Sequence, residues 1–282
     1  MSDAPTTTKS WGDGRLTGEP VSFCAPAGAG GAAKEGPTLS GYLARPSFSA
    51  AGGSGRHGIV LSHGFPEAAQ VVGAPGYGYP ELAERLAAQT GASVLTFNFR
   101  GTGRSGGDFS LEGWRADLAA AIAYLRSSLA VEHVWPVGFA AGGTLCICAA
   151  GEDPSVAGVA AFAPPSAFAE DASDARRFVA QARAMGVIRS REFPPDLAAW
   201  ARELTDLRPV QMAAKVPPRP LLIVHGANDE VVPMSDAREL AEAANGSSEL
   251  RILAGAGHRL LYDPRAIALL IGWFDRHLGF AG

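Results

Sequence analysis

The stretch that decides the fold is Gly138-Phe139-Ala140-Ala141-Gly142-Gly143. It ends the apolar run His133–Gly138 and leads without a loop into the Ala-rich pattern Ala141–Ala150. A short apolar run bounded by glycine is typical of a buried strand, and the Ala-rich pattern is typical of a helix. Glycines two positions before and after Ala140 indicate a turn too tight for a side chain at those places. The stretch therefore predicts a strand that passes into a helix through one sharp turn.

The same alternation of strand and helix continues along the chain on both sides of this turn. The predicted strands are Val21–Cys24, Leu39–Ala44, Gly58–Ser62, Ser93–Phe99, His133–Gly138, Gly158–Ala163, Leu221–His225 and Glu249–Leu253. The predicted helices are Pro80–Gln89, Leu111–Leu129, Ala141–Ala150, Ser235–Ala244 and Pro264–Leu278. Such alternation predicts parallel strands joined by crossover helices. The first two strands are expected to form a hairpin, because the stretch between them has no apolar periodicity.

The connection between the sixth and seventh predicted strands is longer than one crossover helix requires. Its segment 166–207 mixes the aromatic residues Phe168, Phe178 and Trp200 with many charges, which favours a small helical lid. These aromatic side chains would either line a pocket or attach the lid to the sheet, and the second interpretation is favoured. We expect a flexible tail over 1–13 and a single domain over 14–282 that contains the lid.

Charge and cysteine usage restrict the classes of function. The 282 residues carry 24 basic and 28 acidic side chains, and the basic ones are scattered. No nucleic-acid partner is expected, because neutralising phosphates requires a basic face. Cys24, Cys146 and Cys148 cannot form a complete set of disulfides and lack the spacing of a zinc site. No segment approaches the roughly 20 apolar residues of a membrane span. We expect a cytoplasmic protein with no membrane partner, no metal and no organic cofactor.

Polar residues or glycines follow five of the predicted strands directly, where α/β sheets build their sites. They are His63-Gly64-Phe65-Pro66, Arg100-Gly101-Thr102-Gly103, the stretch quoted above, His225-Gly226-Ala227-Asn228-Asp229 and Gly255-Ala256-Gly257-His258. With these fragments in this order, the chain resembles the α/β-hydrolase family from about Val21 to its end. The resemblance implies an α/β-hydrolase fold: a mostly parallel eight-stranded sheet flanked by helices, with the small helical lid between strands six and seven.

The resemblance also assigns roles to residues. In that family the nucleophile lies in G-x-S-x-G on a sharp strand-to-helix turn, and the acid and the histidine follow it in the chain. By resemblance, Asp229 orients His258, which acts as the general base. A base is required because an unassisted hydroxyl is a poor nucleophile near neutral pH. The backbone N–H groups of Phe65 and Ala141 would form the oxyanion hole.

The chain departs from the family at the nucleophile itself. Ala140 occupies the position of the serine and has no oxygen that could form an acyl-enzyme. It is also expected to have strained backbone angles, at a cost of about 1 to 3 kcal/mol that glycine would relieve. Two origins of this alanine are open: natural divergence of the protein, or deliberate replacement of the serine. Gly103-Arg104-Ser105-Gly106-Gly107 also matches G-x-S-x-G, but the long loop Arg100–Ser110 separates its strand from the next helix, so we reject Ser105 as the nucleophile.

Three other polar residues near the turn are expected to be structural. Thr144 lies one helical turn beyond Ala140 and is expected to point into packing, and Cys146 is expected to be a small core residue. His63 is expected to shape the loop before Phe65 by hydrogen bonding.

Three functions are compatible with this site. The first is an esterase or acyl hydrolase lineage that acts on or binds a small acyl or ester compound, with covalent hydrolysis lost or severely impaired. Loss of the serine lowers turnover of subtilisin by about 2 × 10⁶, so little ester cleavage is expected. The second is a small-molecule binding protein without catalysis. The third is general-base chemistry by His258 and Asp229 without an acyl-enzyme. The sequence gives no expectation for the oligomeric state.

Overall fold

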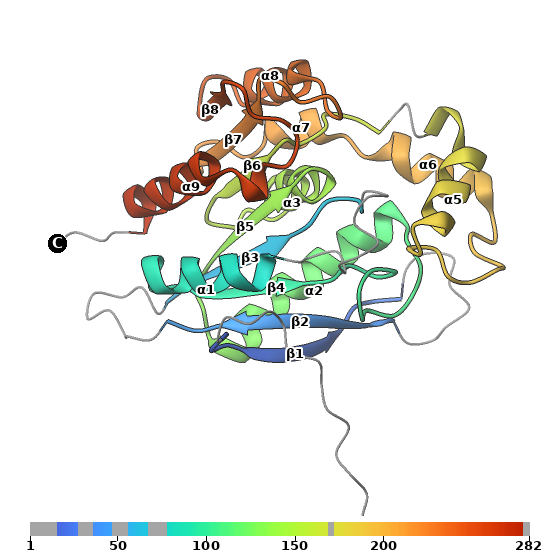
Figure 1. Ribbon diagram of the computed structural model, residues 1–282, viewed down its shortest axis with the longest axis horizontal. Coiled ribbons are helices and arrows are strands. Elements are labelled where there is room, and N and C mark those ends of the chain that lie inside the picture. The colour runs from blue at the N-terminus through green and yellow to red at the C-terminus, as the bar shows by residue number, and fades with distance from the viewer. Residues whose placement is uncertain (1–15, 28–35, 47–55, 67–77, 169–171, 279–282) are drawn as a thin grey trace, which may run out of the picture.

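An eight-stranded sheet forms the centre of the computed structural model, which describes residues 16–27, 36–46, 56–66, 78–168 and 172–278 (Figure 1). Its strands are β1 (Glu19–Cys24), β2 (Thr38–Ala44), β3 (His57–Ser62), β4 (Ser93–Phe97), β5 (His133–Phe139), β6 (Val159–Phe162), β7 (Leu221–Gly226) and β8 (Ser248–Leu253). The spatial order is β1-β2-β4-β3-β5-β6-β7-β8. The strands from β4 to β8 in this order pair in parallel, whereas β1 and β2 form an antiparallel hairpin and β2 pairs antiparallel with β4. All eight predicted strands and the predicted hairpin are confirmed.

Helices cover both faces of the sheet. They are α1 (Tyr79–Thr90), α2 (Leu111–Leu129), α3 (Ala141–Glu152), α5 (Ala175–Ala184), α6 (Leu197–Asp206), α7 (Pro209–Ala213), α8 (Met234–Ala243) and α9 (Pro264–His277). Helices α1 and α9 lie in front of the sheet in Figure 1, and α2 and α3 lie behind it. Each face has its own apolar core because side chains alternate along a strand. In β3, Ile59 and Leu61 belong to the core beneath α1 and α9, whereas Val60 belongs to the core beneath α2 and α3.

The C-terminal helix shows how the sequence pattern produces this layering. The sequence places Ile267, Leu270, Ile271 and Phe274 on one face of this helix; Ile267, Leu270 and Phe274 are buried against the sheet, and Ile271 is partly buried. Trp273 is fully buried beside them. The Asp263 side chain caps the helix by accepting a hydrogen bond from the backbone of Arg265, next to a proline in the first turn.

The segment between β6 and β7 contains α5, α6 and the short α7, of which α7 was not expected. Its aromatic side chains attach it to the rest of the molecule: Phe178 and Trp200 are buried, and Trp200 Nε1 donates to the carbonyl of Phe109 at 3.1 Å. The Asp108 carboxylate accepts the backbone N–H of Ser190 at 2.9 Å. These contacts favour attachment over pocket lining as the role of the aromatics. That the segment 166–207 acts as a lid stays a prediction. The predicted tail over 1–13 lies outside the described residues.

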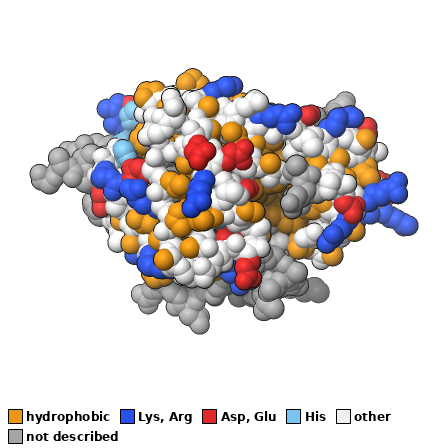
Figure 2. Space-filling view, turned by 90° about the horizontal axis from the view of Figure 1, so that it is seen from above, with side chains coloured by type: hydrophobic (Ala, Val, Ile, Leu, Met, Phe, Trp, Pro, Cys, Tyr) orange, Lys and Arg blue, Asp and Glu red, His pale blue; other side chains and the backbone are white. Residues whose placement is uncertain are grey.

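The surface carries charges of both signs. Figure 2 shows Lys and Arg side chains interspersed with Asp and Glu side chains on the face seen from above. Within the described part of the chain, every helix is too short or too polar to cross a lipid bilayer.

Candidate active site

The turn between β5 and α3 has the sharp geometry that the flanking glycines predict. Ala140 lies at its tip with φ 48° and ψ −126°, a conformation that is costly for any residue with a side chain. Hydrogen bonds hold it there: its N–H donates to the carbonyl of Phe162 at 2.7 Å, and its carbonyl accepts the N–H of Gly143 at 2.8 Å. The backbone strain expected at Ala140 is confirmed.

The glycines on either side of the tip are required because backbone passes close to them. A Cβ on Gly138 would lie 2.3 Å from the carbonyl of Gly142, and a Cβ on Gly142 would lie 2.4 Å from the carbonyl oxygen of His63. A Cβ on Gly64 would lie 2.7 Å from the Cβ of Ala140. The loop after β3 therefore packs directly against the turn.

The loop after β3 is held by a buried histidine. His63 Nε2 accepts the backbone N–H of Phe99 at 3.2 Å, so the ring proton resides on Nδ1, which lies 2.7 Å from the carbonyl oxygen of Gly64. Burial lowers the pKa of His63 to about 4, which keeps the imidazole neutral near neutral pH. His63 thus shapes the loop by hydrogen bonding, as expected.

The two residues expected to donate to an oxyanion adjoin the turn. Phe65 follows Gly64 in the loop after β3, and Ala141 is the first residue of α3. The N–H of a first helical residue has no acceptor within its own helix and is free for a ligand. The ring of Phe65 packs at 5.3 Å from that of Phe178, so the segment containing α5 touches the loop that carries this amide.

Asp229 and His258 form the hydrogen-bonded pair that the sequence predicts. His258 Nδ1 lies 2.9 Å from Asp229 Oδ2, and the Asp229 side chain is fully buried. The other carboxylate oxygen accepts the N–H groups of Val231 and Val232, both at 2.9 Å. Burial by itself would raise the pKa of Asp229, but the bond from His258 and these two amides together hold the pKa below its usual value. Asp229 is therefore ionised and keeps the His258 proton on Nδ1, which leaves Nε2 to act as a base.

Sequence reasoning placed His225 at the end of a strand but assigned it no role at the acid. His225, at the end of β7, is fully buried and its Nε2 lies 2.9 Å from the carbonyl oxygen of Val232 and 3.4 Å from Asp229 Oδ2. A carbonyl only accepts, so Nε2 carries the proton and braces the turn that presents the carboxylate. A histidine within an otherwise apolar buried strand was the signal that could have identified it.

The remaining polar residues that the sequence singled out are structural. Ser105 is fully buried, and its hydroxyl donates to the carbonyl of Asn98 at 2.6 Å and accepts the N–H of Ser40 at 2.9 Å. Thr144 donates to the carbonyl of Pro165. Cys146 is buried, and burial raises its thiol pKa to about 12, so the thiol stays protonated.

The predicted site residues follow three strands that share one edge of the sheet. Ala140 follows β5, and Asp229 and His258 follow β7 and β8, which are parallel to it. The hydrogen bonds between strand ends continue across this edge, from Ala140 to Phe162 and from Ala163 to Val224. The structure thus places all three at the carboxyl edge, where α/β sheets build sites.

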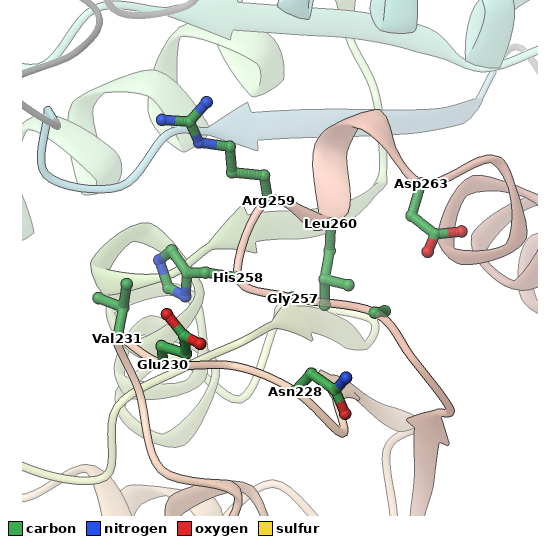
Figure 3. A pocket seen from close by; sticks show the side chains of 9 residues that line it. Asn228, Glu230, Val231, Gly257, His258, Arg259, Leu260 and Asp263 are labelled. Atoms are coloured by element: carbon green, nitrogen blue, oxygen red, sulfur yellow. The ribbon is translucent and has the colours of Figure 1, made fainter.

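A cavity of about 340 Å³ opens beside His258 (Figure 3). It is lined by Asn228, Glu230, Val231, Ala256, Gly257, His258, Arg259, Leu260 and Asp263. These residues come from the segments after β7 and β8, including the short 3-10 helix η3 (Leu260–Tyr262), and do not include Ala140. The volume is at the lower end of the range for small-molecule sites. No group of three or more potential metal ligands occurs within the described residues.

Comparison with known proteins agrees with this architecture. Residues 59–268 match the family model described as "Alpha/beta hydrolase family". Similar solved structures include the esterase Pf2001 of Pyrococcus furiosus, with a TM-score of 0.66 and 17% identity over 98% of this chain and 99% of that chain. The alpha/beta hydrolase GrgF of Penicillium sp. sh18 has a TM-score of 0.68 and 21% identity over 94% of this chain and 100% of that chain. Est1E of Butyrivibrio proteoclasticus has a TM-score of 0.59 and 20% identity over 85% of this chain and 92% of that chain. No curated protein sequence is significantly similar to the chain.

Proposed function

Because the chain belongs to the alpha/beta hydrolase family, we propose that it is an acyl hydrolase scaffold for a small ester or acyl compound whose nucleophile position is Ala140. Asp229 and His258 are the acid and the base of this site, and the amides of Phe65 and Ala141 are its oxyanion donors. Covalent hydrolysis through an acyl-enzyme is lost or severely impaired, because an alanine methyl group cannot attack a carbonyl.

The conformation of Ala140 is the observation that carries this proposal. At φ 48° and ψ −126°, glycine would be the least costly residue if only the fold mattered. A residue with a Cβ at the tip directs a side chain away from the sheet, which is the arrangement that a nucleophile requires. The neighbouring loop leaves room for that Cβ only because residue 64 is glycine.

The pair Asp229–His258 favours a second candidate, general-base chemistry without an acyl-enzyme. The imidazole is oriented by a buried carboxylate and lines a cavity of about 340 Å³. A base held in this way can take a proton from water or from an acidic ligand. A binding protein that uses the same cavity without turnover is the third candidate. We also propose that the protein is cytoplasmic.

Hydrolysis of short p-nitrophenyl esters tests the first candidate. We expect a rate near background for the chain with Ala140 and a gain of at least about a hundredfold for Ala140→Ser, a modest fraction of the effect of serine in subtilisin. Ala149→Ser, which adds the same hydroxyl within α3, is the matched control and should change nothing. The gain should disappear when His258→Ala is added to Ala140→Ser.

Equal rates for the chain with Ala140 and for Ala140→Ser would show that position 140 is not the nucleophile position. A rate in the chain with Ala140 that His258→Ala abolishes would favour the general-base candidate instead. Binding of a small ligand without turnover in any variant would favour the small-molecule binding protein.

A further inference from the structure

We propose that the cavity beside His258 binds the alcohol part of the ligand, and that Glu230 selects an alcohol part that carries a protonated amine. This inference rests on the proposed function. It adds a class of ligand and a residue that determines specificity.

The position of the cavity follows from the chemistry of His258. Its Nδ1 is occupied by Asp229, so Nε2 is the nitrogen that exchanges a proton. When a serine at position 140 attacks an ester, His258 takes the hydroxyl proton and the acyl carbon bonds to the serine oxygen. His258 then gives that proton to the alkoxy oxygen as the carbon–oxygen bond of the ester breaks, which releases the alcohol. The alkoxy oxygen must therefore lie within hydrogen-bonding distance of Nε2, and the rest of the alcohol must occupy space beside the ring. The cavity that His258 lines is such a space.

The charges around this cavity leave one carboxylate uncompensated. Asp263 is neutralised by Arg265, whose Nη2 lies 2.6 Å from its Oδ2. Arg259 also has an interaction of its own. Figure 3 shows its guanidinium directed away from the imidazole, and Glu230 lines the same cavity as His258. Among the described residues, Glu230 has no hydrogen-bond or ion-pair partner.

A protonated amine is the ligand group that matches this arrangement. It carries the opposite charge, and its N–H can donate to the carboxylate. Apolar side chains on the same walls, Val231 and Leu260, suit the short carbon chain that joins the amine to the alkoxy oxygen. Glu230 is exposed, so its contribution is that of a surface ion pair and modest.

Two esters of identical shape test this specificity in the Ala140→Ser variant. The probes are 2-(dimethylamino)ethyl butyrate, which is protonated at neutral pH, and 3-methylbutyl butyrate, its uncharged isostere. We expect kcat/KM for the amine ester to exceed that for the isostere by roughly twofold to fivefold, the range for an exposed ion pair. Glu230→Gln should abolish this preference by raising KM for the amine ester alone. Glu242→Gln, which removes an exposed carboxylate from α8, is the control and should preserve it.

The outcomes separate this inference from the proposed function. If both esters are hydrolysed at equal rates, or if Glu230→Gln slows both equally, the specificity is overturned while the hydrolase scaffold stands.

A binding measurement does not require turnover. In the chain with Ala140, 2-(dimethylamino)ethanol should shift the amide resonance of Gly257 at lower concentration than 3-methylbutanol does, and Glu230→Gln should remove the difference. Equal titrations of the two alcohols would overturn the inference even if no variant hydrolyses an ester.

Discussion

Position 140 combines a strained backbone with a side chain that has no reactive atom. Its positive φ costs an alanine roughly 1 to 3 kcal/mol, and glycine avoids most of that cost. Glycine in turn loses about 0.5 to 1 kcal/mol through the greater freedom of the unfolded chain. We therefore predict that Ala140→Gly raises the free energy of unfolding by about 1 kcal/mol, measured by urea denaturation.

The matched control for that variant is Ala149→Gly within α3, where the backbone is helical. It should lower the free energy of unfolding by up to about 1 kcal/mol. If Ala140→Gly destabilised the protein as much as Ala149→Gly does, the strain argument would be wrong.

Only some of the site residues could be predicted from the sequence. Asp229 and His258 were assigned by the resemblance to the family, from their places in the loops after the seventh and eighth strands, and the hydrogen bond between them agrees with that pairing. His225 was missed because its role depends on the carbonyl of Val232, and backbone groups leave no mark in a sequence. Glu230 was missed because a charged loop residue is ordinarily solvated, and only the cavity gives it meaning.

At the scale of elements, the turn after β5 and the loop after β3 behave as one packed unit. We predict that Gly142→Ala lowers the free energy of unfolding by about 3 kcal/mol, because its Cβ would lie 2.4 Å from the His63 carbonyl oxygen and backbone would have to move. In Ala140→Ser the same change should also remove the gained esterase activity, since it displaces the loop that carries the amide of Phe65.

Gly272→Ala is the control, because this glycine lies within α9 with nothing within 4 Å of its added Cβ. It should stabilise the protein by up to about 1 kcal/mol through helix propensity. Destabilisation of similar size in both variants would contradict the close packing at Gly142.

Helices and strands were predictable where the apolar periodicity and the capping or turn residues indicate the same boundaries. Helix α2 begins and ends where expected, because Ser110 caps it and its apolar face repeats without interruption. Strand β4 ends at Phe97, two residues earlier than expected, although the N–H of Asn98 still donates to the carbonyl of Ser40 in β2 at 2.9 Å. The five-residue α7 was not expected, because so short a helix depends on its tertiary contacts.

For the molecule as a whole, buried titratable groups set the response to acid. The pKa of His63 falls to about 4 in the folded protein because the ring is buried, whereas the unfolded chain protonates near the ordinary value of 6.5. As the pH falls below that ordinary value, His63 binds a proton in the unfolded state but not in the folded state, so the free energy of unfolding decreases. From about pH 7 to pH 5 this amounts to roughly 2 kcal/mol.

Urea denaturation across that range checks this prediction. His63→Gln, which retains a donor and an acceptor, should lose less stability on acidification than the chain with His63. An identical loss in the two proteins would contradict it. Asp229 acts in the same direction at lower pH: its pKa lies below the ordinary value, so its stabilisation is present above that value and is lost as the pH falls through the folded one.

The most direct test of the central claim is covalent labelling with a fluorophosphonate, which reacts with a serine that a neighbouring base has activated. Intact mass and peptide mapping should find one adduct in Ala140→Ser, on residue 140, and none in the chain with Ala140. A labelled serine elsewhere in the chain with Ala140, or a folded Ala140→Ser that the probe leaves unmodified, would contradict the assignment of this turn as the position of a missing nucleophile.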